Sequence, residues 1–475
     1  MVLTRNMFVT LMLVLACISA TASDWPMRRY DAGRTACTPN PLPETLRLQW
    51  MVELPEPKGA WPKQKTVLEH EKYTYEFYGD RDKLQFDVSY TPVSADGRLY
   101  VPSMLYDAII AYDLSTGLEL WRHVADGPVR FAPVAHNGRV YFTSDDGHLY
   151  CVSGEDGTLA WRFRGGPSNR FVLGNERFIN TWPARGGPVV DGDAVYFAAG
   201  IWPFMGIFVH ALDTRTGEVI WTNSASGAMY EQHQHGGAYA FGGIAPHGHI
   251  AVNGDTLLVA GGLTVPAAYN RHTGEFLYYR QSTNMVGKGA GGHAVYTQGR
   301  WFFNDNVMYS LEDGAQFGDM PASVLTEAEI IGVFRGRLTA HDAEPEAREV
   351  EITDRLEGQA IRKLYSMNER WRASVPEGYD QLFLRAGDVY YLAAEDGGIA
   401  ALCVEPGNDD AAVVWRGRVQ GAVGPCWLPM TVWWWLRKKG ASIALARLRS
   451  MRKSIRSSLR RCRHAQPRNV DMPKP

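Results

Sequence analysis

The sequence predicts an all-β protein, an eight-bladed β-propeller, and three observations lead to this fold class. First, residues 91–164 contain one pattern twice: a tight turn, an apolar strand, a second strand, a glycine turn and a strand that reaches a tryptophan. Second, these tryptophans, Trp121 and Trp161, lie about 40 residues apart, the length of one four-stranded blade. Third, 48 Gly, 15 Trp and 22 Tyr in 475 residues suit a large all-β domain.

The strands of each repeat alternate apolar and polar residues, which indicates that they are half-buried. Between them, Asp96-Gly97 and Asn137-Gly138 provide the positive φ angles that tight hairpin turns need. One such blade cannot bury both of its faces, whereas a ring of blades does. The repeats therefore predict a ring rather than isolated sheets.

Drifting copies of the repeat continue along the chain, and we count eight blades. Two copies end at Trp221 and Trp415, and a third has Tyr278 in the tryptophan position. Two more copies, at residues 293–314 and 324–371, are less regular.

Residues 46–50 end in Trp50 and have the pattern of the last strand of a blade whose other strands are missing nearby. We expect this N-terminal strand to close the last blade, because closure of the ring removes an exposed sheet edge. Residues 51–90 are interpreted as an insertion before the first complete blade.

The first residues have the charged, apolar and small-residue order of a secretory signal. Arg5 precedes an apolar run at residues 7–18, and cleavage is expected after Ala22. The run is shorter than the roughly 20 apolar residues that span a bilayer, which disfavours a membrane anchor. We therefore expect residues 1–22 to be a signal peptide and the protein to be exported to the periplasm or cell envelope of a bacterium. Cys17 leaves a lipoprotein as the alternative.

The cysteines give a weak signal. Cys151 and Cys403 occupy the same position of the repeat among strand residues, so we expect two core thiols rather than a disulfide. The sequence contains no CxxC pair, no CxxCH haem segment and no adjacent cysteine pair.

The repeat resembles the pyrroloquinoline-quinone-type propeller repeat, whose core is Ala-x-Asp-x-x-Thr-Gly-x-x-x-Trp. This core runs here from Ala111 to Trp121 and from Ala211 to Trp221, and the resemblance covers about residues 23–425. It implies a propeller in which each repeat tryptophan docks one blade on the next. The tryptophans in this role would be Trp50, Trp121, Trp161, Trp221, Trp371 and Trp415.

The resemblance leaves two functions open, because it includes quinoprotein dehydrogenases and also scaffolds without a cofactor, such as the propeller lipoprotein of the outer-membrane β-barrel assembly machinery. The dehydrogenases carry an adjacent cysteine pair and often a haem segment, and this sequence has neither. We expect a non-catalytic binding or assembly scaffold without a cofactor. The alternative is an oxidoreductase that uses pyrroloquinoline quinone and calcium.

A long insertion at residues 165–187 is a candidate binding loop, since long loops on rigid scaffolds often carry function. Arg170, Arg177 and Arg185 would meet an anion there, with Trp182 or Trp202 as a stacking surface. The equal alternative is that the arginines only brace the loop.

Histidines and one acid form the second candidate site. Glu231, His233 and His235 alternate and would share one face of a strand. With His247, His249 and His293 from neighbouring blades they would bind a metal ion, but we favour solvated loop histidines. The metal stays unassigned.

The net charge of the chain indicates which classes of binding partner to expect. A net charge of −2 argues against nucleic acid as the main partner, because phosphate binding needs a basic surface. We expect a monomer that binds an unidentified protein or small molecule. Membrane contact would come only from a lipid anchor or an appended domain.

The C-terminal residues 426–475 depart from the repeat. Eleven Lys or Arg residues lie between Arg437 and Arg463 with no acidic residue, so that a literal interpretation gives a basic arm. In the reading frame that starts at the third base of each codon, however, the gene segment for residues 426–446 can encode LAADDGLVVVTEEGRIYCFG if suitable synonymous codons are used. This shifted sequence restores a turn, a Val strand and a copy of residues 146–151. We therefore expect a frameshift near Pro425, an incomplete last blade, and no sheet for Trp50 to complete.

Overall fold

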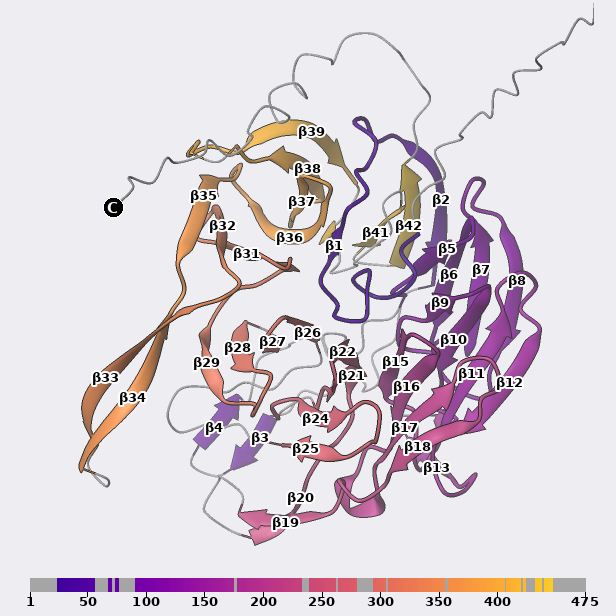
Figure 1. Ribbon diagram of the computed structural model, residues 1–475. Helices are drawn as coiled ribbons and strands as arrows, with labels where there is room; N and C mark the ends of the chain where they lie inside the picture. Colours follow the sequence, from indigo (N-terminus) through magenta and orange to yellow (C-terminus); the bar gives the residue numbers. More distant parts are fainter. Residues whose placement is uncertain are drawn as a thin grey trace, which may run out of the picture.

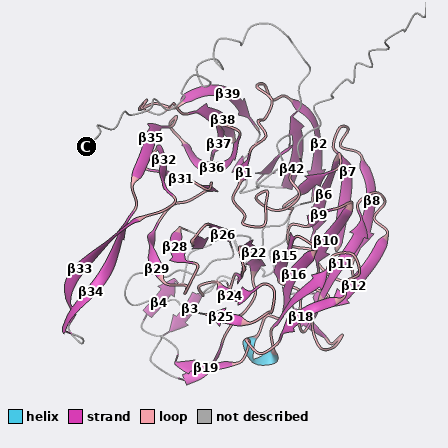
Figure 2. Ribbon diagram, viewed as in Figure 1, coloured by secondary structure: helices cyan, strands magenta, loops and turns pink. Residues whose placement is uncertain are grey.

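The computed structural model describes residues 24–55, 67–70, 73–76, 90–174, 177–232, 239–261, 264–279, 294–304, 306–354, 358–405, 407–419, 422–423, 432–437 and 440–446. In these ranges the chain is almost entirely β-structure (Figure 2), with the 3-10 turn η2 (Pro203–Met205) as an exception. The expected signal peptide at residues 1–22 lies outside the described part and stays a prediction.

In the described residues, eight sheets of four or five strands surround a central region that contains the N-terminal segment (Figure 1). The expected all-β propeller is confirmed. We call these sheets blades and number them along the chain, with the strands of each blade ordered from the centre outward. In the first four blades the strands are β5 (Val93–Ala95), β6 (Arg98–Ser103), β7 (Ala108–Asp113), β8 (Glu119–Val124); β9 (Val134–His136), β10 (Arg139–Thr143), β11 (His148–Ser153), β12 (Leu159–Arg164); β15 (Gly186–Asp191), β16 (Ala194–Ala199), β17 (Phe208–Asp213), β18 (Val219–Asn223); and β22 (Ala251–Asn253), β23 (Thr256–Val259), β24 (Ala267–Asn270), β25 (Phe276–Tyr278).

The next three blades have the same meander of antiparallel strands. Their strands are β26 (Val295–Gln298), β27 (Trp301–Asn304), β28 (Val307–Ser310), β29 (Gln316–Asp319); β30 (Val324–Leu325), β31 (Glu329–Phe334), β32 (Arg337–Asp342), β35 (Glu369–Ser374); and β36 (Tyr379–Ala386), β37 (Val389–Ala394), β38 (Gly398–Cys403), β39 (Ala412–Arg418). Two short strands, β21 (Gly248–His249) and β1 (Cys37–Thr38), add in parallel to the innermost strands β15 and β36.

The eighth blade joins the two ends of the chain. Strand β2 (Leu48–Leu54) pairs antiparallel with β42 (Gly440–Ala446), which is followed by β41 (Val432–Arg437) and β40 (Ala422–Val423). The N-terminal strand thus closes the last blade, as expected. The expectation that this blade is incomplete and that Trp50 has no sheet is wrong.

The residues of the C-terminal hairpin explain that difference. Residues 432–437 and 440–446 are rich in Trp, Val, Ile and Leu, and Gly440 follows the turn, so they suit a β-hairpin even though they do not repeat the blade sequence. A frameshift as the origin of residues 426–475 stays a prediction.

The tryptophans of the repeat lie in the seams between blades. Trp121 of blade 1 donates its indole N–H to the Gly154 carbonyl of blade 2 over 3.2 Å, and a Cβ at Gly157 would lie 2.5 Å from the indole. Tyr278 replaces the indole with a hydroxyl that donates to the Leu311 carbonyl of blade 5. The same indole contact to the next blade is made by Trp50 to Leu114, Trp161 to Thr214 and Trp221 to Arg271.

The later tryptophans differ from this pattern. Trp371 donates to the Glu329 carboxylate inside its own blade, and Trp415 packs with Tyr391 and Ala401 of blade 7. The regular seams are therefore the five between blades 8 and 1, 1 and 2, 2 and 3, 3 and 4, and 4 and 5.

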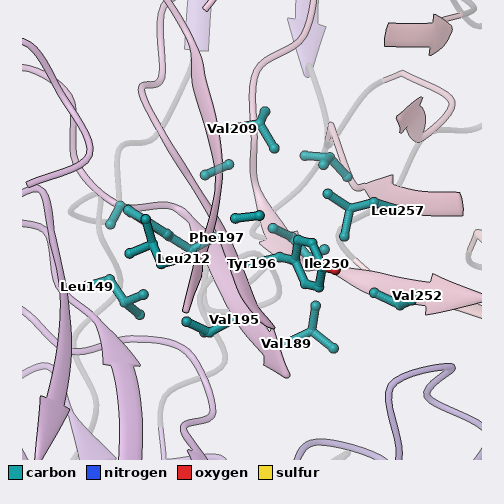
Figure 3. Packing of buried hydrophobic residues seen from close by; sticks show 14 of the residues in the cluster. Leu149, Val189, Val195, Tyr196, Phe197, Val209, Leu212, Ile250, Val252 and Leu257 are labelled. Atoms are coloured by element: carbon teal, nitrogen blue, oxygen red, sulfur yellow. The ribbon is translucent and has the colours of Figure 1, made fainter. Parts of the chain in front are cut away.

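The largest hydrophobic cluster lies in the seams around blade 3 (Figure 3). Leu149 of blade 2 and Leu257 of blade 4 pack with Val189, Val195 and other apolar residues of blade 3. Cys151 belongs to this cluster and is a buried free thiol. Cys403 is disulfide-bonded to a cysteine outside the described residues, so the expectation of two core thiols is correct for Cys151 only.

Residues 25–38, which we call the axial segment, run around the inside of the ring. Trp25 exchanges two backbone hydrogen bonds with Ser94 of blade 1. The carbonyls of Pro26, Ala32, Gly33, Thr35 and Ala36 then accept from Ala135, Val252, Thr297, Leu325 and Arg385, on the innermost strands of blades 2, 4, 5, 6 and 7. The axial segment thus fastens almost every blade to the centre.

Arginines hold the axial segment in shape. The fully buried Arg34 donates to the carbonyls of Arg28, Pro188 and Ile250, and Arg29 donates to those of Arg34 and Ser323. Burial lowers the pKa of both Arg34 and Arg29 to about 9, so that they stay protonated at neutral pH. Their charge is satisfied largely by backbone carbonyls.

The ring has two faces, and successive connections between antiparallel strands lie on them alternately. We call them the turn face and the loop face. The turn face carries the links from first to second and from third to fourth strands, which are mostly short, such as Asp96-Gly97. The loop face carries the links between blades and from second to third strands. On it lie η2 and three hairpins: β3 (Val67–His70) with β4 (Tyr73–Glu76), β13 (Phe171–Gly174) with β14 (Arg177–Asn180), and β19 (Met229–Gln232) with β20 (Tyr239–Gly242). One long arm, β33 (Glu346–Asp354) with β34 (Gly358–Ser366), belongs to a link from a third to a fourth strand and projects from the ring (Figure 1).

Candidate functional site

The loop face between blades 1 and 4 holds the residues with the most functional potential, and its centre is a buried carboxylate between two arginines. Arg130 Nε donates to Asp145 over 2.6 Å, and Arg185 donates to both oxygens of Asp145 over 2.7 and 3.0 Å. Burial alone would raise the pKa of Asp145, but the two guanidinium groups outweigh it and hold the pKa below its ordinary value. Asp145 is therefore an anion that fixes two loops.

His249 lies next to this ion cluster. Its Nε2 accepts from the Ala132 N–H over 3.0 Å, and Arg28 Nη1 lies 2.7 Å from its Nδ1. Phe131 makes edge contacts with both His249 and His247, at ring-centroid distances of 5.2 and 6.5 Å.

The proposed metal site cannot be assembled from the residues that the structure describes. His233, His235 and His293 lie outside the described ranges, and Glu231 lies in β19. Within those ranges no group of three or more His, Cys, Asp or Glu residues is arranged to hold a metal ion. Metal binding by the histidines outside them stays a prediction.

Two of the three loop arginines brace the loop. Arg177 donates to the Asp107 carboxylate and to the Met104 carbonyl of blade 1, while Arg185 is the partner of Asp145. Arg170 is exposed, and its carbonyl oxygen accepts from the N–H and hydroxyl of Thr181. The contacts of Arg177 and Arg185 favour the bracing alternative, and anion binding by Arg170 stays a prediction.

The two candidate stacking residues have different surroundings. Trp182 is half-buried and donates its indole N–H to the Met205 carbonyl over 2.8 Å, which ties the 165–187 loop to η2. Trp202 is 52% exposed and lies beside Phe204. The structure thus brings Trp182 into the scaffold and leaves Trp202 at the surface.

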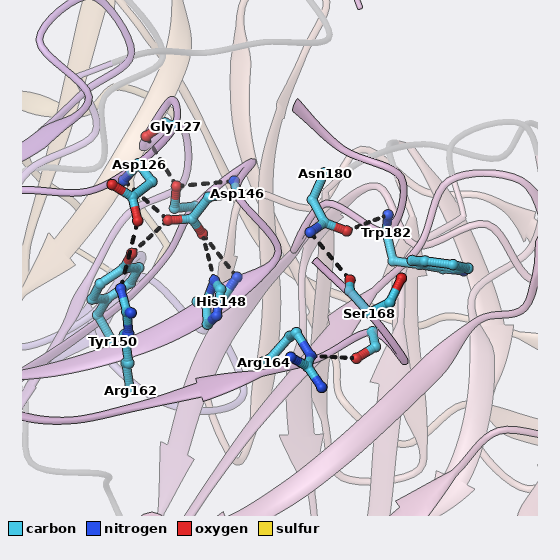
Figure 4. A network of polar contacts seen from close by, with 12 residues as sticks. Asp126, Gly127, Asp146, His148, Tyr150, Arg162, Arg164, Ser168, Asn180 and Trp182 are labelled. Atoms are coloured by element: carbon cyan, nitrogen blue, oxygen red, sulfur yellow. Dashed lines mark hydrogen bonds and ion pairs between the residues drawn. The ribbon is translucent and has the colours of Figure 1, made fainter. Parts of the chain in front are cut away.

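A polar network under the loop was missed in the sequence (Figure 4). The buried Asp146 accepts from the Asp126 and His148 backbone N–H groups and from the Tyr150 hydroxyl. On the other side of the loop, the Asn180 side chain accepts from the Trp182 N–H. Nothing in the sequence around Asp146 indicated which hydroxyl and amides its carboxylate would bind.

Exposed apolar side chains gather on three neighbouring projections of the loop face, and we call this set the aromatic surface. Most of its members are aromatic and exposed by more than half: Phe171, Leu173, Phe178, Trp202, Phe204, Tyr230, Tyr239 and Phe241. They come from the β13–β14 hairpin, the η2 loop and the β19–β20 hairpin. Exposed apolar groups of this extent are typical of binding surfaces. Only Trp202 was singled out from the sequence, although the apolar composition of the insertions was the available signal.

The comparisons with known proteins agree on the fold. Residues 47–224 match a protein-family model described as outer membrane protein assembly factor BamB. No curated protein matches the chain in sequence.

Three solved structures resemble the chain over most of its length. The quinohemoprotein alcohol dehydrogenase from Comamonas testosteroni is 13% identical with a TM-score of 0.52, and the alignment covers 91% of this chain and 82% of that one. A europium-containing methanol dehydrogenase is 12% identical with a TM-score of 0.51, covering 90% and 98%. The quinohemoprotein alcohol dehydrogenase from Pseudomonas putida HK5 is 12% identical with a TM-score of 0.50, covering 90% and 80%.

At such low identity the structural likeness concerns the fold and not the activity. The blade repeat, its tryptophan seams and the family match point the same way. The chain therefore has the fold of the pyrroloquinoline-quinone-like β-propellers, and residues 47–224 match the family model itself.

Proposed function

We propose that this protein is a non-catalytic scaffold of the cell envelope, which binds a protein partner through the loop face of its propeller. The observation that carries this proposal is the aromatic surface. Phe178, Phe204 and Phe241 are each more than 60% exposed on separate projections of one face. Exposed aromatic side chains are costly in water and are enriched at the centres of protein interfaces.

The rigid base of these projections supports a binding role. Arg177 ties the β13–β14 hairpin to blade 1, and Trp182 ties the same loop to η2. The β19–β20 hairpin packs Met229 against the main core. A surface that is held in place loses less conformational entropy on binding than a mobile one.

The oxidoreductase alternative fits the described residues poorly. Calcium takes six to eight oxygen ligands, and the described residues offer no cluster of acids for it. The buried carboxylate of Asp145 is already engaged by Arg130 and Arg185, and the axial segment runs around the inside of the ring. We therefore derive no reaction through a quinone or calcium.

The location in the envelope rests on two further observations. The expected signal sequence favours export, and the matching family is described as an outer membrane protein assembly factor. In the described ranges, the structure has no helix with the length and apolarity to span a bilayer.

Photo-crosslinking in the cell tests the proposal. A photoreactive amino acid replaces Trp202 on the loop face or, as the matched control, Leu118, which is 67% exposed on the turn face. We expect a discrete crosslinked protein from position 202 and none from position 118. The same pattern from both positions, or crosslinks from neither, would contradict a partner on the loop face.

Thermal unfolding with and without pyrroloquinoline quinone plus calcium tests the alternative. A ligand at 100 times its Kd stabilises a protein by about 2.7 kcal/mol. We expect no shift in Tm and no dye-linked alcohol oxidation. A clear rise in Tm together with oxidation would replace the scaffold by an enzyme.

A further inference from the structure

The β19–β20 hairpin differs on its two faces. Met229 faces the main hydrophobic cluster, and its partner Gly242 is buried. The opposite face presents Tyr230, Tyr239 and Phe241, which are 61–62% exposed. The hairpin is therefore fixed to the propeller by one side and offers three rings to solvent on the other.

The three rings form an ordered ladder rather than scattered exposed residues. Tyr230 lies directly opposite Phe241 in the strand register, with ring centroids 5.2 Å apart. Tyr239 lies on the same face, with its centroid 5.9 Å from that of Tyr230. Cross-strand aromatic contacts of this kind stabilise a sheet and would continue onto a further strand.

In the part of the chain that the structure describes, this two-stranded sheet has an open edge. Among the described residues β19 and β20 pair only with each other, and β20 is the strand that contacts η2. Figure 1 shows β19 at the border of the molecule. The outer edge of β19 thus presents backbone N–H and C=O groups that an extended backbone satisfies best.

We propose that the outer edge of β19 pairs with an extended segment of a partner protein, whose apolar side chains alternate and pack beside Tyr230 and Phe241. This inference rests on the proposed scaffold function and names the chemistry of its partner. Alternation follows from strand geometry, because only every second residue of an added strand reaches the ring face. The backbone pairing gives affinity for many sequences, while the ladder selects strands with one apolar face.

A labelled peptide tests the proposal with the full-length protein. The probe is a peptide of about eight residues that alternates valine and threonine between terminal lysines. The control probe has the same sequence with N-methyl groups on every second residue, which removes edge hydrogen bonds but keeps the side chains. We expect fluorescence anisotropy to show saturable binding of the first probe, and binding weaker by about ten-fold or more for the second.

Variants locate the binding edge. The double variant Tyr230→Ser/Phe241→Ser should weaken peptide binding by about ten-fold, because it removes two cross-strand contacts. Leu118→Ser is the matched control: Leu118 is 67% exposed on the turn face, and its loss should leave the affinity unchanged. All variants should keep the parent Tm, since each replaced side chain is largely exposed.

Three results would overturn the proposal. Equal binding of the N-methylated probe would show that the rings only attract apolar groups. Loss of affinity in Leu118→Ser to the same extent would show that the peptide binds exposed apolar residues on either face of the propeller. Binding to lipid vesicles, lost in the double variant while neither peptide binds, would make the ladder a membrane contact.

Different results would contradict the proposed scaffold function and the proposed strand pairing. If position 202 still crosslinks a partner while the peptide does not bind, the scaffold function is supported and the strand pairing is contradicted. If quinone and calcium raise Tm and support oxidation, the scaffold falls whatever the peptide does.

Discussion

Aromatic residues occupy two kinds of site in this propeller, and the comparison separates what holds the ring together from what it presents. In the seams, Trp121 has a carbonyl acceptor and a glycine pressed against its ring. On the loop face, Trp202 and Phe241 are more than half exposed. The same residue types therefore stabilise the fold at one site and cost solvation free energy at the other.

The seam between blades 2 and 3 extends this comparison to a titratable group. His210 stacks on Phe197 with ring centroids 4.9 Å apart and donates its Nε2–H to the Gly165 carbonyl over 2.8 Å. Thr222 Oγ1 lies 2.9 Å from Nδ1 and donates to it in the neutral tautomer. A seam residue thus depends on the neutral state, whereas surface rings are indifferent to pH.

The largest effect is expected from loss of a seam tryptophan. Trp121→Ala should reduce the free energy of unfolding by about 3–5 kcal/mol, because it empties the space between blades 1 and 2. Urea denaturation measures the change. Trp121→Phe keeps most of the ring and loses the hydrogen bond to Gly154, so it should cost about 1 kcal/mol. Equal losses in both variants would mean that the hydrogen bond and not the packing dominates.

Acidification should weaken the seam at His210. Burial lowers the pKa of His210 to about 4, from 6.5 in the unfolded chain. Below pH 6.5 the unfolded chain binds a proton at His210, whereas the folded protein does not bind it until the pH approaches 4. The contribution of His210 to the free energy of unfolding is therefore complete above pH 6.5 and is lost as the pH falls toward 4. The shift corresponds to about 3 kcal/mol. Denaturation at several pH values measures it.

The matched variant for this pH effect is His210→Gln, which keeps a donor for the Gly165 carbonyl but does not titrate. Its stability should fall less steeply between pH 6.5 and 4 than that of the parent protein. Parallel curves for the two proteins would assign the acid sensitivity to other groups, such as the ion-paired Asp145.

The seams were predictable from the sequence because their geometry leaves a side-chain pattern. A glycine four residues before Trp121, Trp161 and Trp221 marks both the turn and the surface on which the preceding tryptophan lies. Tyr278 was recognised as a substitute for the same reason, and its hydroxyl reaches the next blade. Packing contacts that repeat in every blade can therefore be predicted from the sequence.

The axial segment was not predictable, because its contacts are made by backbone carbonyls. Pro26, Ala32 and Gly33 contribute oxygen atoms that every residue has, and no side-chain spacing reveals them. The ion pairs of the loop were hidden in a different way. Arg177 pairs with Asp107 and Arg185 with Asp145, across distances in sequence that only the folded ring closes.

Glycine variants compare a seam with an open turn at the same backbone angle. Gly157 has a φ of 73° and faces Trp121, whereas Gly97 has a φ of 72° and nothing within 4 Å of an added Cβ. Gly97→Ala should cost about 1 kcal/mol through backbone strain alone. Gly157→Ala should cost about 1–3 kcal/mol more, because the methyl group displaces the indole. Equal costs would show that the blades shift freely at the seam.

The smallest effect on stability is expected at the aromatic surface, and it is the test that separates the two kinds of site most directly. Trp202→Ser removes a large ring, yet the free energy of unfolding should change by no more than about 0.5 kcal/mol, because the ring is 52% exposed and has little packing to lose. The matched loss at Trp121 should be several times larger although the same side chain is truncated. A loss of more than about 2 kcal/mol at Trp202 would place it in the scaffold and remove it from the binding surface. If stability is unchanged and position 202 crosslinks a partner in the cell, the exposed ring is maintained for that partner, since the fold gains nothing from it.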